Sequence, residues 1–217
     1  MATIIPARGG SKGLPGKNLM TFCGKPLLAW SILQAPPPVY VTSDSDTILA
    51  VAKAYGAIGI KRPPELATDT ASSESALKHA LGFIGEAAQI IFLSVTSPLR
   101  RNSDIGLALE QFRFSGVDSL FSCCKAGDLC LWEEENGRLY GLTYDPANRG
   151  RRQDRSPQYI ENGSIYIFKP EILTRYNNRL GGQIGRYEML PWQQYEIDDE
   201  ETFDLCRYQF VKHGLDR

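Results

Sequence analysis

The 217-residue sequence lacks the features that identify membrane, secreted and zinc-binding proteins. No apolar run approaches the roughly 20 residues that span a bilayer. The first apolar run follows Met1 directly, so we expect no signal peptide. The cysteines are odd in number and form no Cys-x-x-Cys pair, which disfavours both a disulfide framework and zinc; they are Cys23, Cys123, Cys124, Cys130 and Cys206. Reduced thiols of this kind indicate a cytoplasmic protein.

An excess of charge of either sign is also missing. The chain has 24 basic and 25 acidic residues and a net charge of −1, which argues against broad binding to nucleic acid or to an anionic membrane. Histidine is scarce, and His79 and His213 both lie in helix-like stretches, where surface or packing roles are expected. The length fits one α/β domain with at most a small subdomain.

What the sequence does have is a basic, glycine-rich stretch at residues 5–18. It contains four glycines, two prolines, one arginine and two lysines. Glycines let successive backbone amides turn toward an anion, and nearby cations suit a polyphosphate. The spacing Gly10-x-x-Gly13-x-x-Gly16 matches neither the P-loop nor the dinucleotide-binding fingerprint. A basic surface turn is the plain alternative, but it needs neither this length nor this cation density.

The pattern of apolar runs predicts a doubly wound, mostly parallel, Rossmann-like α/β sheet. Strands are expected at 2–5, 39–43, 57–60, 89–93, 118–124 and 184–190, and helices at about 26–34, 46–55, 72–86, 104–115 and 200–213. The alternation of strands and helices that indicates a parallel sheet is interrupted at Asn136-Gly137, which predicts a hairpin turn. Ligands bind such sheets at the carboxyl ends of the strands, where the loop at 8–18 falls.

Three further stretches carry polar residues suited to ligand binding. Ser72 and Ser73 begin a helix, where they cap it and can also contact a ligand. Residues 148–155 hold four arginines, which suit an anionic small substrate better than nucleic acid because the cluster is short and lacks interleaved aromatics. Glu196 and Asp198 alternate along an expected strand, which would point both carboxylates to one side for a metal ion.

Read together, these stretches resemble the cytidylyltransferases that form CMP-sugars from CTP and sialic acids or related keto sugar acids. Residues 5–18 are similar to the family's opening signature, and 62–73 to its cytidine-pocket stretch. Residues 93–100 resemble Leu-Gln-Pro-Thr-Ser-Pro-Leu-Arg, with Ser94 in place of Gln and Val95 in place of Pro. The family's Asp-Ile-Asp corresponds to 196–198, where glutamate replaces the first aspartate.

The arginine-rich part resembles the sialic acid enzymes of animals and their bacterial relatives, through Arg-Arg-Gln-Asp followed by Glu-Asn-Gly-Ser-x-Tyr. Many bacterial enzymes have an arginine where this chain has Ile160, so Arg152 or a neighbour would bind the sugar carboxylate. In the family the segment corresponding to about 125–165 is a small β-rich dimerisation subdomain that reaches into the partner's site. The resemblance covers nearly all of 1–217 and implies one domain of the nucleotide-diphospho-sugar transferase type, a homodimer with shared active sites.

The resemblance also assigns expected roles to individual residues. Expected nucleotide contacts are Ala7, Arg8, Gly10, Ser11, Lys12, Lys17, Asn18, Arg62, Ala71, Ser72 and Ser73. Expected sugar contacts are Ser94, Arg152, Gln153, Asn162 and Tyr166. Arg8, Lys17 and Asp198 would be catalytic, and Asp198 with Glu196 would bind Mg²⁺. Asp199, Glu200 and Glu201 need no role beyond favouring a helix start.

The expected reaction is transfer of CMP from CTP to the anomeric hydroxyl of a sialic acid-like nonulosonic acid, with release of pyrophosphate. Ser94 and Ile160 depart from the family pattern and leave other acid sugars open: legionaminic, pseudaminic or 3-deoxy-manno-octulosonic acid. A nucleotide-binding regulator without turnover is the alternative from another class, and the presence of Arg8, Lys17 and Asp198 argues against it.

Overall fold

The chain folds around a seven-stranded sheet with the strand order β11-β7-β10-β6-β1-β4-β5. The computed structural model describes residues 1–10, 13–127 and 129–216. The sheet strands are β1 (Ala2–Pro6), β4 (Val39–Ser43), β5 (Ile58–Lys61), β6 (Ile90–Leu93), β7 (Ser119–Lys125), β10 (Tyr159–Phe168) and β11 (Ile184–Met189). All neighbouring pairs are parallel except those of β10, which runs antiparallel to both β6 and β7. The predicted mostly parallel α/β fold is therefore confirmed.

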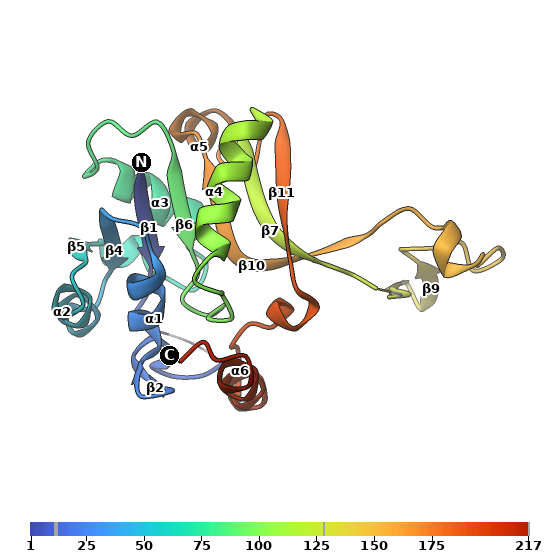
Figure 1. Ribbon diagram of the computed structural model, residues 1–217, viewed down its shortest axis with the longest axis horizontal. Helices are drawn as coiled ribbons and strands as arrows, with labels where there is room; N and C mark the ends of the chain where they lie inside the picture. Colours follow the sequence, from blue (N-terminus) through green and yellow to red (C-terminus); the bar gives the residue numbers. More distant parts are fainter. Residues whose placement is uncertain (11–12, 128, 217) are drawn as a thin grey trace.

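Helices cover both faces of this sheet. They are α1 (Leu27–Gln34), α2 (Asp46–Ala54), α3 (Ser73–Leu81), α4 (Asp104–Ser115), α5 (Pro170–Tyr176) and α6 (Glu200–Lys212). α1, α2, α4 and α6 contribute buried side chains to one apolar cluster, while α3 and α5 contribute to the cluster on the opposite face. Figure 1 shows α4 lying across the sheet. The central strands β1 and β6 are mostly apolar and almost entirely buried because both of their faces are covered.

Chain order places a switch point beside β1. The chain passes from β1 to β4 on one side and later returns to β6 on the other side. Loops that leave two strands on opposite sides of such a point diverge, and the crevice between them is where α/β sheets bind ligands. Residues 7–10 and 13–18 follow β1 and residues 94–103 follow β6, so both segments border this crevice.

Two expected elements differ in the structure. The helix expected at 72–86 ends at Leu81, since Gly82 and Gly85 follow and helix propensity falls there. Residues 195–199 form an irregular loop and not a strand, after a 3₁₀ turn at Pro191–Gln194. The loop makes one backbone hydrogen bond toward the β6 side, from Ile197 N to Thr96 O at 2.8 Å. The argument from strand alternation for Glu196 and Asp198 therefore does not apply.

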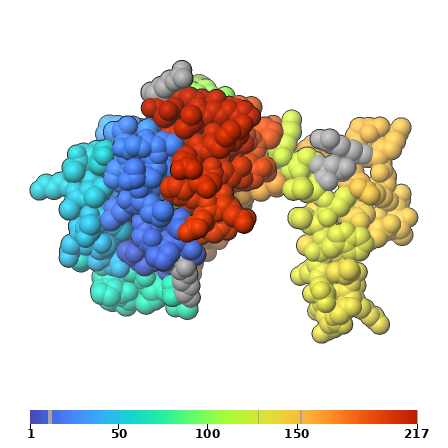
Figure 2. Space-filling model, turned by 90° about the horizontal axis from the view of Figure 1, so that it is seen from below, coloured from blue at the N-terminus to red at the C-terminus, as the bar shows by residue number. Residues whose placement is uncertain are grey.

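The predicted hairpin is present, but it stands away from the body of the molecule. Strands β8 (Trp132–Glu135) and β9 (Arg138–Gly141) pair through Asn136 and Gly137, which have φ of 52° and 75° as an Asn-Gly turn requires. We call residues 126–127 and 129–158 the arm. Figure 1 shows the arm extending from the ends of β7 and β10, and Figure 2 shows it standing apart from the body. Within the described ranges, no helix is long and apolar enough to cross a bilayer.

Candidate active site

A pocket of about 540 Å³ opens at the carboxyl ends of β1, β5 and β6. Four stretches separate in the sequence form its walls: the loop after β1, residues 62–73, the turn after β6, and the loop before α6. Nine of the predicted site residues line it: Arg8, Lys17, Asn18, Arg62, Ala71, Ser72, Ser73, Ser94 and Asp198. The fold thus gathers residues that span almost the whole chain into one concave site.

The loop after β1 is closed by a hydrogen bond between its two ends. Asn18 is buried, and its Nδ2 donates to the carbonyl oxygen of Arg8 at 2.9 Å. Gly16 has φ of 68°, in the left-handed region, and it precedes a short 3₁₀ turn that contains Lys17. Because the ends of the loop are tied together, the side chains of Arg8 and Lys17 both face the same pocket.

Lys17 connects the loop to the opposite wall of the pocket. Its Nζ donates to the carbonyl oxygen of Ile197 at 2.8 Å and to Oδ1 of Asp198 at 3.0 Å. Gly13 comes close to the same segment, since a Cβ at this position would lie 2.3 Å from the carbonyl oxygen of Asp198. The Lys17 side chain is only 15% exposed, whereas that of Asp198 is 74% exposed. The cation is therefore fixed in place, and the carboxylate remains accessible to a ligand.

Arg62 is the residue whose surroundings most clearly indicate ligand binding. It is 5% exposed, lines the pocket, and has no acceptor for Nε or Nη2 among the described residues. Burial lowers the pKa of its guanidinium, and the nearby Asp44 opposes that change. A buried guanidinium with unused donors is costly unless a ligand accepts them. Arg8, by contrast, is paired with Asp69 at 3.0 Å.

The amino end of α3 also opens onto the pocket. Ser72 caps the helix, with its Oγ accepting from the backbone N of Ser75 at 3.1 Å. Ser72 and Ser73 both line the pocket. The capping role foreseen for Ser72 is present, and the positive end of the helix dipole is directed toward the same space. This wall can bind polar or anionic groups of a ligand.

The turn after β6 forms the third wall and is linked to Glu196. Oγ of Ser94 and Oγ1 of Thr96 are hydrogen-bonded at 2.8 Å, and Thr96 donates to Oε2 of Glu196 at 3.2 Å. Burial raises the pKa of Glu196, and the hydrogen bond from Thr96 opposes this. Glu196 also packs against Gly163, where a Cβ would lie 2.2 Å from Oε1. Glu196 thus lies behind the pocket wall, and Asp198 lies in it.

The same turn is held from below by Arg100, which is fully buried. Its Nη1 donates to the carbonyl oxygens of Ser94 at 3.1 Å and Ser97 at 2.6 Å, and its Nε donates to Gln34 of α1. Burial lowers the pKa of Arg100 to about 10. Satisfying a buried cation with backbone carbonyls fixes the path of the turn, so the position of Ser94 at the pocket wall is set by the core.

A divalent cation fits this donor set, although the described residues form no group of three or more side chains able to hold a metal ion. Mg²⁺ is commonly bound by one or two carboxylates together with the oxygens of a phosphate ligand. Asp198 supplies an exposed carboxylate within the pocket. Glu196 lies close enough for the charge of Asp198 to contribute to its raised pKa.

Other predicted site residues lie outside the pocket. Ala7 is buried at the end of β1, and Gly10 is exposed beside the pocket without lining it. The side chain of Asn162 is buried, where it accepts from Ser122 and donates to the carbonyl oxygen of Gln193. Roles for Ala7, Gly10 and Asn162 in ligand binding stay predictions.

Tyr166 is also buried, with its ring stacked on Phe92. Gln153 is exposed on the arm. Ser11, Lys12 and the side chain of Arg152 lie outside the part of the chain that the structure describes. A single chain therefore assembles the expected nucleotide contacts much more fully than the expected sugar contacts.

The structure adds pocket residues that were not predicted individually. Gly13, Thr68, Asp69 and Thr96 line the pocket beside the predicted ones. All four fall inside the stretches that resemble family motifs, so position within a motif was the available signal. Their specific contacts, such as that of Thr96 with Glu196, join residues 100 positions apart and are not visible in the sequence.

Comparison with known proteins adds independent information. Residues 2–207 match the family described as cytidylyltransferase. The chain is 33% identical to N-acylneuraminate cytidylyltransferase of Oncorhynchus mykiss over 99% of its own length and 51% of that protein. It is 34% identical to N-acylneuraminate cytidylyltransferase of Escherichia coli O18:K1:H7 over 94% of its length and 50% of that protein. The chain thus spans about half the length of these relatives.

Among solved structures, the fold is similar to that of a CMP:2-keto-3-deoxy-manno-octonic acid synthetase complexed with CTP. The TM-score is 0.72 at 20% sequence identity, and the match covers 98% of this chain and 99% of the other. At this identity the similarity concerns the fold: a mostly parallel α/β sheet with an antiparallel strand inserted.

Proposed function

The chain belongs to the cytidylyltransferase family, and on that basis we propose that it transfers CMP from CTP to a sialic acid-like sugar acid. The oxygen of the sugar's anomeric hydroxyl forms a bond to the α-phosphorus of CTP. The bond from that phosphorus to the bridging oxygen breaks, pyrophosphate leaves, and the hydroxyl proton is released. The observation that carries the proposal is the pocket in which Arg8, Lys17 and the unpartnered Arg62 converge.

The fixed cations supply most of the proposed chemistry. The carbonyl of Ile197 holds the Lys17 side chain beside the pocket, so its ammonium group is already in position when the triphosphate binds. When CTP binds, Arg8 gives up part of its ion pair with Asp69 and donates hydrogen bonds to phosphate oxygens. Charge that develops on the leaving pyrophosphate is stabilised most by groups already oriented toward it. The donors of Arg62 and the wall formed by Ser72 and Ser73 bind the nucleoside part.

We include Mg²⁺ in the proposal, with Asp198 as the principal ligand and Glu196 as the second. A bound Mg²⁺ neutralises phosphate charge and acidifies an oxygen that contacts it. The role of the chain is to present the accessible carboxylate of Asp198 opposite Lys17. Oε2 of Glu196 already accepts a hydrogen bond from Thr96, which makes Glu196 the weaker ligand of the two.

We also propose that the working form is a homodimer in which the arm completes the partner's site. The pocket of one chain contains the expected nucleotide contacts, whereas Gln153 lies on the arm, away from the body. The arm exposes Leu139 (65%) and Leu142 (59%), and a two-stranded hairpin is marginally stable unless its apolar side chains pack against another surface. An arginine of the arm would then bind the sugar carboxylate with two parallel hydrogen bonds.

The compartment proposed for this reaction is the cytoplasm. All five cysteines are free thiols. Burial raises the pKa of Cys123 to about 11 and that of Cys124 to about 12, which keeps both thiols protonated and inert. Free, buried thiols of this kind are typical of proteins in a reducing environment.

The direct test measures pyrophosphate release from CTP and Mg²⁺ with a panel of sugar acids: N-acetylneuraminic, legionaminic, pseudaminic and 3-deoxy-manno-octulosonic acid. We expect release with N-acetylneuraminic acid at the highest kcat/KM. A higher kcat/KM with another sugar acid of the panel would assign the reaction to that sugar. Ser94 allows this outcome, because its short side chain lines the pocket where the family has glutamine. Binding of CTP without release for every sugar would refute the enzyme and favour the regulator.

A further inference from the structure

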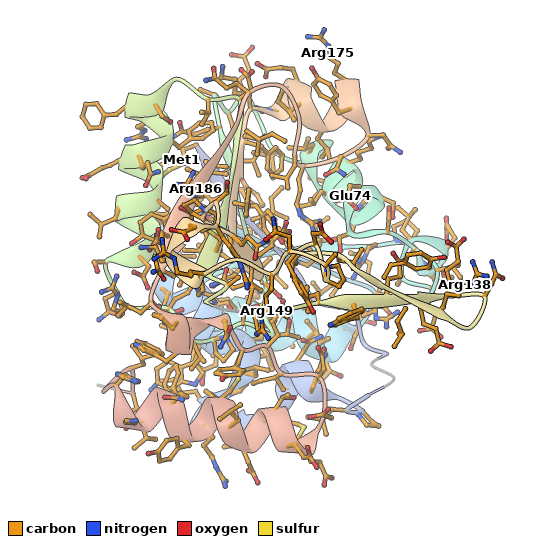
Figure 3. The ribbon with its side chains drawn as sticks, turned by 90° about the vertical axis from the view of Figure 1, so that its right-hand side faces the viewer. Met1, Glu74, Arg138, Arg149, Arg175 and Arg186 are labelled. Carbon is orange, nitrogen blue, oxygen red and sulfur yellow. The ribbon has the colours of Figure 1, made fainter. Side chains whose placement is uncertain are left out.

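Arg179 forms a largely buried ion pair with the first turn of the helix that borders the pocket. Arg179 lies between α5 and β11, and its Nη1 donates to Oε1 of Glu74 at 2.7 Å. The two side chains are only 20% and 18% exposed. Figure 3 shows Glu74 on α3. Breaking a buried pair leaves an uncompensated charge, so this contact holds its two segments together more firmly than a surface ion pair does.

The other side of the Arg179 guanidinium packs on the central sheet. It lies 4.3 Å from the ring centre of Tyr166 and 5.1 Å from that of Phe92. These rings belong to β10 and β6 and are stacked on each other with their centres 5.3 Å apart. A planar guanidinium can stack on rings and donate to a carboxylate at the same time, which lysine does less well. Arg179 therefore connects α3 to the two strands in the middle of the sheet.

The connected part of α3 is the part that borders the pocket. Glu74 directly follows Ser72 and Ser73, which both line the pocket. A second contact between α3 and the segment after α5 lies one turn farther along, where Lys78 donates to Asn177. Lys78 is exposed and farther from the pocket, so the two contacts differ in what they can position.

We propose that Arg179 is a positioning residue that sets the nucleoside wall of the pocket through Glu74. Arg179 is not among the residues that line the pocket, so it acts through α3 and not by touching the ligand. The inference rests on the proposed binding of CTP at this site. Loss of the pair lets the amino end of α3 move relative to β6, and small displacements of binding groups reduce affinity strongly.

Ser72 and Ser73 border the nucleoside part of the site and lie away from the reacting phosphates in the proposed arrangement. Their displacement should weaken ground-state and transition-state binding equally, which raises KM and leaves kcat unchanged. We expect the KM for CTP to rise about tenfold in Arg179→Ala, with kcat within about twofold of the wild-type value. Arg179→Lys should give an intermediate rise, because it keeps the charge and loses the stacked geometry.

The experiment compares Arg179→Ala, Arg179→Lys, Glu74→Gln and the double variant Arg179→Ala/Glu74→Gln. It measures CTP affinity by calorimetry, kcat and KM by pyrophosphate release, and the melting temperature. If one contact is responsible, the losses in CTP affinity should not add in the double variant. Glu74→Gln is the milder change and carries the test if Arg179→Ala does not fold.

Lys78→Ala is the matched control, because it removes the other contact of the same interface. We expect it to lower the melting temperature while leaving the KM for CTP unchanged. Unchanged CTP affinity in the folded Arg179 and Glu74 variants would refute the inference, as would an equal rise in KM for Lys78→Ala. Wild-type protein that binds no CTP would refute the proposed function as well, so the two failures are distinguishable.

Discussion

The pocket and the arm are built in opposite ways. The pocket walls are tied to the core: Asn18 closes the loop after β1, and the buried Arg100 holds the turn after β6. The arm makes most of its contacts within itself and exposes its large apolar side chains, with Leu139 at 65% and Leu142 at 59%.

In the proposed dimer, this difference separates what one chain does by itself from what it contributes to its partner. The pocket is organised before any ligand arrives, since Lys17 already occupies a fixed position. The arm contains a turn and a two-stranded sheet, and a hairpin of this size is marginally stable by itself. In our proposal, the body binds the nucleotide, and the arm mediates assembly and contributes to the choice of sugar.

The largest effect is expected from Lys17→Ala on the pocket side. Removing a preoriented donor to developing charge lowers kcat by about 10²- to 10³-fold in comparable sites. The fold should persist, because Lys17 contacts a loop and not the core. Pyrophosphate release and circular dichroism provide the measurement, and Lys61→Ala, which breaks an exposed pair with Asp46, is the control. Unchanged turnover would remove Lys17 from the site.

The next effect tests the arm. Leu139→Asp places a charge on its exposed apolar side, and burying that charge in an interface is costly. We expect self-association to weaken at least about tenfold, equivalent to about 1.4 kcal/mol, as measured by sedimentation at several concentrations. Phe114→Asp makes the same kind of change on the body, where Phe114 of α4 is 90% exposed, and should leave the mass unchanged. Equal effects of the two variants would show that the arm is not the dimer interface.

The smallest effect concerns the pH dependence of stability behind the pocket wall. Because burial raises the pKa of Glu196, the folded state holds this proton more tightly than the unfolded state does. The free energy of unfolding contributed by this group therefore falls as the pH rises through the raised pKa. Glu196→Gln cannot ionise, so it should melt slightly higher than wild type at neutral pH. That advantage should disappear as the pH falls toward the ordinary carboxyl pKa.

Melting curves from pH 4 to pH 8 measure this effect, with the exposed Glu110→Gln as the baseline. A Glu196→Gln protein that is less stable than wild type at neutral pH would mean that its charge is stabilising. In that case Glu196 would be paired more strongly than its hydrogen bond from Thr96 indicates.

Much of the parallel sheet could be predicted from local pattern. Val39–Ser43 is rich in β-branched and aromatic residues between turn signals, and it forms β4 with the predicted bounds. β10 (Tyr159–Phe168) is not among the predicted strands, and its antiparallel direction could not be read from the sequence, because an apolar run such as Ile165–Phe168 is compatible with either direction. The loop at residues 195–199 could not be predicted either. The alternation of its residues favours a strand, but among the described residues its backbone makes one hydrogen bond toward β6.

Predicted site residues line the pocket mainly where they belong to contiguous motifs, and several that depend on distant contacts lie outside it. Ser72 follows from helix-capping chemistry, and it lines the pocket. Asn162 was expected to meet the sugar, but its amide is used in the core by Ser122 and Gln193, which lie 40 and 31 residues away. Such pairings depend on how strands align, and that information is not contained in a short pattern.

The close approach of Gly13 to the carbonyl of Asp198 also bears on how the site comes into being. The two positions are separated by most of the chain, and closing a loop of that length is among the slower events of folding. During synthesis the glycine-rich loop leaves the ribosome well before its opposite wall at Asp198 is made. The nascent chain therefore contains β1 and the loop that follows it before a competent site can form.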